Sequence, residues 1–276
     1  MSKTIMKLTD LKEELKMEKF CIVEINACSN QEAQKKLRFK GDGDARVVLL
    51  VEELLNRQIF DIISIRELTY SALIKLERVL ALRGYKRYIH KDWDNVDTKN
   101  RGRYSCLTVV FVHDSVDSFE QIYSDDKFET TLRYVAGKFK VDGQPVIYKS
   151  SHIPCVEDSH PNIASQLRRK ENMLRDELEF QLENIDNCVI CAGDYNCDSV
   201  GTYHCKDLFN QLPYKDAVEE PTYGENQKLD HVFLSPCIVE GKSDMKVQVR
   251  VLPEYYMDYT DHRIISVDIY NDVEDI

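Results

Sequence analysis

Short apolar runs alternate with longer amphipathic segments along most of this chain. The apolar runs predict strands near residues 20–26, 61–66, 85–90, 105–112, 131–141, 144–151, 188–193, 229–235, 246–252 and 263–270. Helical periodicity predicts helices near residues 44–58, 69–83, 161–184 and 203–211. Some strands are joined by tight turns and others by helices, which favours two packed mixed β-sheets with helices on the outside. We therefore expect an α/β protein, a four-layer α/β-sandwich.

The organisation of the chain predicts one main domain. We find no internal repeat, no linker rich in proline, glycine or serine, and no low-complexity tract, so residues 20–270 are expected to form a single domain. Residues 1–19 are charged, place Leu8, Leu11 and Leu15 on one face, and predict an N-terminal helical extension. Residues 271–276 are expected to form an acidic, frayed tail.

The composition bears on the compartment. No window is long and apolar enough for a membrane span, and the first residues lack the apolar core of a signal peptide. The cysteine count is 9, an odd number that is typical of a reducing compartment. We expect a cytoplasmic protein.

Polar residues follow the apolar run at residues 188–192. Gly193-Asp194-Tyr195-Asn196 reads as a tight turn at the end of a buried strand. A carboxylate and a carboxamide two residues apart can hold a water molecule or a phosphate oxygen, and open α/β sheets bind ligands at their strand ends. Taken alone, the motif is equally consistent with ordinary turn chemistry.

Other predicted strand ends also carry polar groups. Asp230-His231 and Asp261-His262 stand just before strands, so each dipeptide is expected to place a carboxylate and an imidazole at the mouth of a strand. Glu67 and His152 each end an apolar run. Carboxylates ligate hard divalent cations, and an imidazole can stabilise or protonate a phosphate.

With these motifs in this order, the chain resembles the endonuclease/exonuclease/phosphatase superfamily, whose members share the deoxyribonuclease I-like fold. The resemblance extends from about Phe20 to Ile269. It implies that the chain hydrolyses phosphoric esters. The matching positions, in chain order, are Asn26, Glu67, Arg133, His152, Asp194 with Asn196, Asp230, and Asp261 with His262.

The resemblance implies a divalent metal site. Glu67 corresponds to the principal ligand of the family, assisted by Asn26 and Asp261. The family usually has a tryptophan before the asparagine, whereas this chain has Ile25. Carboxylate and amide oxygens suit a hard cation, so Mg²⁺ or Mn²⁺ is the expected cofactor.

The remaining matches imply catalytic and phosphate-binding roles. Asp194 would orient or deprotonate the attacking water, and Asn196 would hold a phosphate oxygen. Asp230 would pair with His262 and fix its tautomer and charge. His152 and Arg133 would contact the phosphate, although a strand-end histidine and a solvated strand arginine are alternative interpretations of these two positions.

The charge distribution leaves the substrate open. The net charge of −11 gives no general attraction for nucleic acid. Residues 83–103, however, hold seven basic residues against three aspartates, with tyrosines and Trp93 between them, which suits phosphate contacts and base stacking as well as it suits a solvated hairpin loop. Arg101 and Arg103 are the candidates for substrate binding there. Two further basic candidates are Lys35 to Arg38 and Arg168-Arg169-Lys170, the latter expected on the solvent face of a helix.

The chain lacks the signature of any one branch of the superfamily. Abasic-site endonucleases usually have asparagine at the position of His152, deoxyribonuclease I has a glutamate partner near residues 103–106, and the 5-phosphatases have a tryptophan-rich motif around Asp194. We predict a metal-dependent nuclease that acts by in-line attack of an activated water, with DNA as substrate more than RNA and no protein partner. The alternatives are a hydrolase of a small phosphorylated molecule or phospholipid head group, and a non-catalytic binding module of the same fold.

Overall fold

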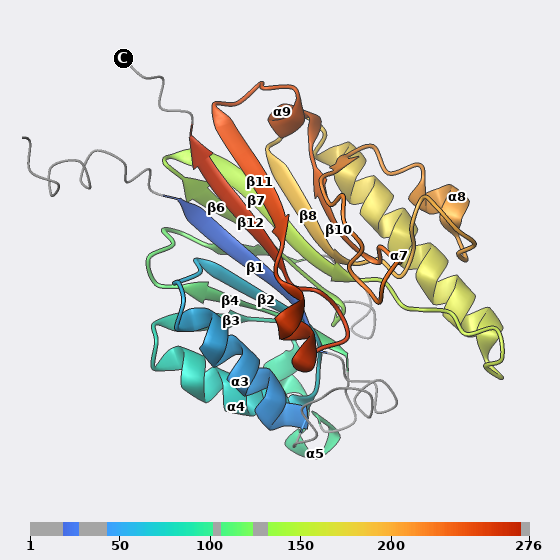
Figure 1. The fold of residues 1–276 in the computed structure, drawn as a ribbon, viewed down its shortest axis with the longest axis horizontal. Helices are drawn as coiled ribbons and strands as arrows, with labels where there is room; N and C mark the ends of the chain where they lie inside the picture. The colour runs from blue at the N-terminus through green and yellow to red at the C-terminus, as the bar shows by residue number, and fades with distance from the viewer. Residues whose placement is uncertain (1–18, 28–42, 102–105, 124–131, 272–276) are drawn as a thin grey trace, which may run out of the picture.

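The structure is a computed structural model, and it describes residues 19–27, 43–101, 106–123 and 132–271. Its centre consists of two six-stranded β-sheets, here called sheet A and sheet B (Figure 1). Sheet A has the order β11 (Met245–Val251), β12 (Ile265–Asn271), β1 (Phe20–Asn26), β2 (Ile62–Leu68), β4 (Leu107–His113) and β3 (Tyr85–Tyr88). Sheet B has the order β5 (Glu120–Ile122), β6 (Tyr134–Val141), β7 (Gln144–His152), β8 (Val189–Asp194), β10 (Asp230–Leu234) and β9 (Lys215–Asp216).

Helices cover the outer face of each sheet. Helices α3 (Gly43–Leu55) and α4 (Tyr70–Ala81) pack on sheet A, and the long helix α7 (Ile163–Glu183) packs on sheet B (Figure 1). The shorter helical segments are α5 (Thr98–Arg101), α8 (Lys206–Phe209), α9 (Pro236–Val239), η1 (Trp93–Asn95) and η2 (Glu254–Asp258). The resulting helix–sheet–sheet–helix arrangement confirms the predicted four-layer α/β-sandwich.

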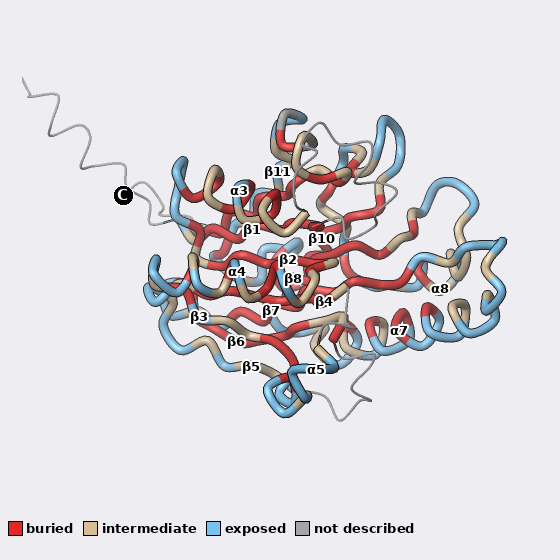
Figure 2. Tube along the Cα trace, turned by 90° about the horizontal axis from the view of Figure 1, so that it is seen from below, coloured by how far each residue is buried: buried red, intermediate tan, exposed pale blue. Residues whose placement is uncertain are grey.

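Both faces of the central strands are buried, as the red strands in Figure 2 show. In β1, Ile22 packs into the core between the sheets, whereas its neighbour Val23 packs under α3 and α4. A strand covered on both faces needs apolar residues at successive positions. This explains why the sequence shows unbroken apolar runs instead of alternation.

Each sheet contains one parallel pair of strands among antiparallel ones. In sheet A, β1 and β2 are parallel, and in sheet B, β7 and β8 are parallel. In sheet B, the register places Asp194 opposite His152 on one side and opposite Asp230 on the other. The pairing alone therefore aligns three of the predicted site residues in one row.

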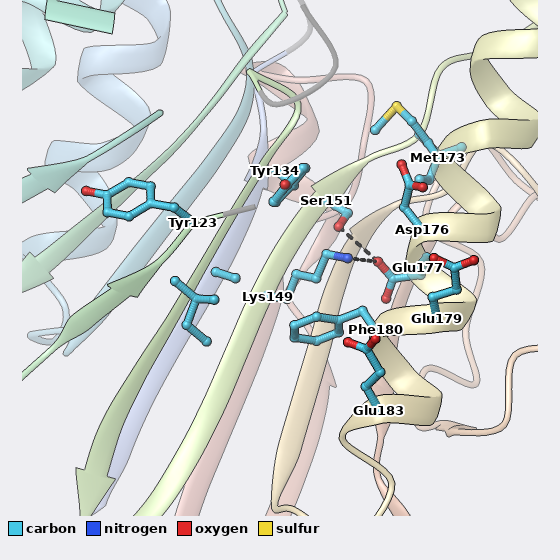
Figure 3. Close-up of a pocket in the computed structure, with 13 residues that line it drawn as sticks. Tyr123, Tyr134, Lys149, Ser151, Met173, Asp176, Glu177, Glu179, Phe180 and Glu183 are labelled. Carbon is cyan, nitrogen blue, oxygen red and sulfur yellow. Dashed lines mark hydrogen bonds and ion pairs between the residues drawn. The ribbon is translucent and has the colours of Figure 1, made fainter. Parts of the chain in front are cut away.

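A buried ion pair attaches α7 to sheet B (Figure 3). Glu177 of α7 accepts hydrogen bonds from Lys149 Nζ at 2.8 Å, Ser151 Oγ at 3.3 Å and Tyr195 OH at 3.1 Å. The Lys149 ammonium also lies 4.3 Å from the centre of the Phe180 ring. The cavity of about 310 Å³ beside this pair contains none of the predicted site residues.

The predicted strands and helices agree with the structure, except that some short elements were not predicted and the ends of others differ. The predicted helix at residues 203–211 is shorter than expected, because only Lys206–Phe209 form α8. Strands β5 and β9 and the helical segments α5 and α9 were not predicted. Residues 1–18 and 272–276 lie outside the described residues. No helix in the described part of the chain is long and apolar enough to cross a membrane.

Candidate active site

The first half of the candidate site is the row formed by the ends of β7, β8 and β10. His152 and Asp194 are the last residues of β7 and β8, Asp230 is the first residue of β10, and all three are buried. Gly193 allows β7 and β8 to approach, since a Cβ atom on it would lie 1.9 Å from the carbonyl oxygen of Ser151. Its φ of +150° is also one that other residues rarely adopt.

The second half of the site comes from sheet A. Asn26 ends β1, and its Nδ2 donates a hydrogen bond to Asp194 Oδ2 at 3.1 Å. Glu67 lies where the register of β2 against β4 shifts between Ile65 and Leu68, and its φ is +51°. Such an irregularity re-aims a side chain at a sheet edge. Glu67 Oε1 lies 3.5 Å from His152 Nε2 of sheet B.

The Asp230–His262 pair joins the two halves. His262 Nδ1 lies 2.7 Å from Asp230 Oδ2. Arg66, which is buried in β2, donates to Asp230 Oδ1 at 3.2 Å and also bonds to Glu24 of β1. The hydroxyl of Thr222 accepts the backbone N–H of Asp230 at 2.9 Å. Both oxygens of Asp230 are therefore held by groups that are charged or can become charged.

This environment makes His262 cationic. Burial disfavours the imidazolium, but the adjacent Asp230 carboxylate overcomes this effect and raises the pKa of His262 to about 10. Burial likewise opposes ionisation of Asp230, yet His262 and Arg66 lower the pKa of Asp230 below its usual value. At neutral pH the pair is an imidazolium and a carboxylate.

Asp194 has a different protonation behaviour. Burial, together with the nearby Asp230 carboxylate, raises the pKa of Asp194 to about 7. Its Oδ1 accepts the backbone N–H of Asn196 at 2.8 Å, and Asn196 itself has a φ of +46°. Lys170 of α7 holds this turn by donating from Nζ to the Asn196 carbonyl oxygen at 2.6 Å. A carboxylate that titrates near neutrality is suited to act as a general base.

His152 is held in a defined neutral tautomer. Arg133 Nη1 lies 3.2 Å from His152 Nδ1. Because a guanidinium can only donate, Nδ1 is the acceptor and the ring proton resides on Nε2. Burial and the Arg133 charge keep the pKa of His152 well below its usual value. His152 therefore presents a neutral Nε2–H donor on the side of Glu67 and Asp194.

The residues present fit a hard divalent cation. Glu67, Asp194, Asp261 and His262 line one cavity of about 370 Å³, here called the active-site cavity. Asp261 Oδ1 is buried without a hydrogen-bond partner among the described residues. Ligand atoms of Glu67, His152 and Asp194 lie within 4.8 Å of one another. Oxygen donors dominate this set, which suits Mg²⁺ or Mn²⁺.

The structure brings together most of the residues predicted for the site, but not all. Arg101 does not line the active-site cavity. Its guanidinium donates hydrogen bonds to the carbonyl oxygens of Val96 at 2.9 Å and Asp94 at 2.7 Å, and it lies over the Trp93 ring. Trp93 is itself fully buried. Arg103 and Lys35 to Arg38 lie outside the described residues. The residues brought together are Asn26, Glu67, Arg133, His152, Asp194, Asn196, Asp230, Asp261 and His262.

The Asp230-His231 dipeptide does not act as a unit. Successive residues of a strand face opposite sides, so the His231 ring lies away from Asp230. Its two nitrogens lie 2.8 Å from Asp216 Oδ2 and 2.8 Å from the Cys197 carbonyl oxygen. The imidazole partner of Asp230 is His262, as the family resemblance implied.

Two cationic residues of the site were missed from the sequence. Arg66 interrupts the apolar run of β2, and together with Glu24 in β1 it could have indicated a buried ion pair. Lys170 was expected on the solvent face of its helix, and this expectation was wrong, because Lys170 is buried against the Asn196 turn. The helical period of α7 did indicate its inward position, because Lys170 precedes the buried Met173 and Leu174 by three and four residues.

Comparison with known proteins supports the fold. No model of a known protein family matches the chain, and no curated protein does so. Among solved structures, D. rerio TDP2 complexed with single strand DNA product superposes with a TM-score of 0.60 at 16% identity, covering 92% of this chain and 100% of that one. An endonuclease/exonuclease/phosphatase family protein of Bacteroides thetaiotaomicron gives a TM-score of 0.60 at 14% identity, over 92% and 98% of the two chains.

A third solved structure that is similar to this chain is named as a phosphatase. The mannosyl-6-phosphatase of Bacteroides thetaiotaomicron VPI-5482 gives a TM-score of 0.60 at 16% identity, covering 91% of this chain and 99% of that chain. The three structures share one architecture with this chain across nearly its whole length. The chain therefore has the deoxyribonuclease I-like fold of endonuclease/exonuclease/phosphatase proteins, as the sequence predicted.

Proposed function

We propose that the chain is a divalent-metal-dependent phosphodiester hydrolase, and specifically a nuclease that acts on DNA. The observation that carries this proposal is the position of Asp194. This buried carboxylate lies in register between His152 and Asp230, and shares a cavity with the carboxylates of Glu67 and Asp261. Acids and donors arranged in this way match the needs of in-line attack by water on a phosphorus atom.

Glu67, Asp261 and Asn26 are the residues that would hold the cation. When bound there, Mg²⁺ or Mn²⁺ would neutralise charge on the phosphate and stabilise the leaving oxygen. Asn26 remains tied to Asp194 through its Nδ2. One proposed metal ligand is thus hydrogen-bonded directly to the proposed general base.

Asp194 acts on the attacking water. With its pKa near 7, the carboxylate is about half ionised at neutral pH and can take a proton from a water hydrogen-bonded to it. The Asn196 backbone N–H and the Asn26 amide fix the two carboxylate oxygens in place. The base therefore requires no reorganisation before the proton transfer.

The donors of the site stabilise the charge that develops on the phosphoryl oxygens. His262 supplies a positive charge, and His152 supplies a neutral Nε2–H donor. The Asn196 Nδ2 donates one hydrogen to the Ile153 carbonyl oxygen at 2.9 Å, so its second hydrogen can be donated to a phosphoryl oxygen. Removal of one donor of this kind typically lowers kcat by about 10²–10³-fold.

We propose DNA as the substrate, and one of the comparisons supports this choice. The D. rerio TDP2 structure contains a single strand DNA product on the same fold. The second candidate is a small phosphorylated molecule, since a mannosyl-6-phosphatase also has this fold and the net charge of this chain is −11. The two candidates share the same hydrolytic site and differ in what the surrounding surface binds.

The test is hydrolysis in the presence of Mg²⁺ or Mn²⁺, with and without chelator. Substrates are single- and double-stranded DNA, RNA and bis-p-nitrophenyl phosphate. Glu67→Gln should lower metal-dependent kcat at least about 100-fold, because it removes a ligand charge while keeping the side-chain shape. Glu171→Gln, on the exposed face of α7, is the matched control and should retain activity.

The outcomes separate the candidates. Chelator-sensitive cleavage of DNA that requires Glu67 supports the nuclease. Hydrolysis of the small ester alone moves the substrate to small phosphorylated molecules. Undiminished hydrolysis by Glu67→Gln, with an unchanged unfolding curve, contradicts the proposed site.

A further inference from the structure

A second cavity of about 550 Å³, here called the flanking cavity, adjoins the active-site cavity. The two cavities share Glu67, Cys155 and Asn196 in their walls. The part that belongs to the flanking cavity alone includes Arg133 and Arg169. Any substrate whose phosphate contacts Asn196 therefore has this cavity directly beside it.

The flanking cavity concentrates positive charge. Arg133, which is half-buried and in contact with His152, and Arg169, which is exposed on α7, both line it. Among the described residues neither guanidinium forms an ion pair with a carboxylate, whereas Arg66 and Arg175 both do. Burial, followed by repulsion from Arg169, lowers the pKa of Arg133 below its usual value. The carboxylates of Glu67 and Asp194 offset part of this charge from the side of the active-site cavity, but neither forms an ion pair with Arg133 or Arg169 among the described residues. Two neighbouring guanidinium groups without an ion-pair partner favour an anionic ligand between them.

The start of α7 adds to this charge. Asn162, the N-cap residue, and Ser165, in the first turn, both line the flanking cavity. No side chain caps the first amides of this helix, which is 21 residues long. The N-terminus of a helix carries a partial positive charge, so it reinforces the attraction for an anion that the two arginines already provide.

We propose that the flanking cavity binds a second phosphate group of the substrate, next to the phosphate that is hydrolysed, and that Arg169 determines this specificity. The inference rests on the proposed function. It deepens it by naming a substrate that carries two neighbouring phosphates, as a nucleic acid strand or a small bisphosphorylated molecule does. A substrate with a single phosphate would leave Arg133 and Arg169 without an ion-pair partner in the flanking cavity.

The experiment uses esters that release p-nitrophenol, so that the hydrolysed phosphate is known. The small substrates are thymidine 5′-(p-nitrophenyl phosphate) with and without a 3′-phosphate, and thymidine 3′-(p-nitrophenyl phosphate) with and without a 5′-phosphate. The chain substrates are the corresponding p-nitrophenyl esters of dithymidylate, with either a normal phosphodiester or a neutral methylphosphonate linkage. KM and kcat are measured at one fixed Mg²⁺ concentration.

Arg169→Gln is compared with Arg168→Gln. Both residues are exposed on α7 and the charge change is identical, but only Arg169 lines the flanking cavity. In the wild type, the second phosphate should lower KM about tenfold in at least one positional series, as expected for a charge-assisted hydrogen bond. Arg169→Gln should remove most of this advantage, and Arg168→Gln should preserve it.

The outcomes are distinct. If only the internucleotide phosphate lowers KM, the cavity binds a nucleic acid strand. If a terminal phosphate lowers KM as well, the cavity binds a phosphate group on any carrier. Equal KM values with one and two phosphates in every series overturn the inference, as do equal effects of the two substitutions. Absence of metal-dependent hydrolysis of every ester contradicts the proposed function itself and the inference with it.

Discussion

Gly193 connects the backbone of sheet B with the chemistry of Asp194. The glycine sits where β7 and β8 approach, and the Ser151 carbonyl oxygen occupies the space of a missing side chain. The next residue is the proposed general base. Any displacement of β8 here would move the carboxylate relative to His152 and Asn26.

Gly193→Ala is expected to destabilise the fold by at least about 3 kcal/mol, because backbone must move to admit the new Cβ. Gly143→Ala is the matched control, since Gly143 also has a positive φ but nothing lies within 4 Å of its added Cβ. The control should cost only about 1–2 kcal/mol for the left-handed backbone. Denaturant unfolding measures the free energy of unfolding of both variants. Equal losses of stability would show that the close approach of Gly193 to Ser151 does not add to the cost of the new Cβ.

The Asp230–His262 pair predicts a dependence of stability on pH. The folded pKa of His262, about 10, is raised above its ordinary value of 6.5. The resulting stabilisation is fully present below pH 6.5 and declines as the pH rises through 10. The free-energy difference between wild type and His262→Asn should therefore shrink between pH 7 and pH 10. A difference that stays constant over this range would mean that His262 is neutral in the folded protein.

Single residues of the site differ in how well the sequence revealed them. Glu67, Asp194 and His262 were predicted because each stands where an apolar run meets polar residues, and because the family resemblance assigned them roles. Arg66 and Lys170 were missed because their importance depends on partners far away in the sequence. Arg66 contacts Asp230 across 164 positions, a relation that one strand pattern cannot disclose.

At the scale of elements, α7 is attached to sheet B through one buried ion pair. The Lys149 ammonium and Glu177 carboxylate lie 2.8 Å apart, and both side chains are almost fully buried. Glu177 also accepts the hydroxyl of Tyr195, which lies between Asp194 and Asn196. The helix that carries Arg169 and Lys170 is thereby connected to the turn that holds the proposed base.

Glu177→Gln should destabilise the protein by about 3–5 kcal/mol, since it leaves the Lys149 ammonium buried without its counter-charge. Glu179→Gln on the exposed side of the same helix should change stability by less than about 0.5 kcal/mol. Thermal or denaturant unfolding distinguishes them. Equal, small effects would indicate that solvent reaches Lys149 and relieves its charge.

Elements were predictable in proportion to their length. Strands β1 and β7 stood out as apolar runs, and α7 stood out by its helical period over 21 residues. Strand β9 has only two residues, Lys215 and Asp216, and no period can be read from so short a segment. The predicted helix at residues 203–211 was longer than α8. The helix begins only after its N-cap residue Cys205, which adopts a left-handed conformation with a φ of 62°, and the composition does not predict this conformation.

At the scale of the whole molecule, the net charge of −11 opposes a polyanionic substrate. Among the described residues that line the two cavities, local positive charge comes from Arg133, Arg169, Lys170 and His262. This arrangement would bind a few phosphates at the site and repel the rest of a long strand.

The affinity for single-stranded DNA should consequently depend only weakly on salt. Two phosphate contacts predict a slope of about −1.4 in a plot of log affinity against log salt concentration. KM for an oligodeoxynucleotide, measured at constant Mg²⁺ and varied NaCl, gives this slope. A slope steeper than about −4 would require an extended basic surface and contradict the local arrangement.

The pairing of β1 with β12 has a consequence for how the protein folds during its synthesis. Strand β12, the second strand from one edge of sheet A, follows the described strands of sheet B in the sequence and pairs with β1 (Figure 1). Asp261 and His262 immediately precede that late strand. During synthesis, the chain up to Asp194 supplies four of the six strands of each sheet, and Asp261 and His262 follow only later. The proposed hydrolytic site would therefore be complete only after β12 has paired with β1.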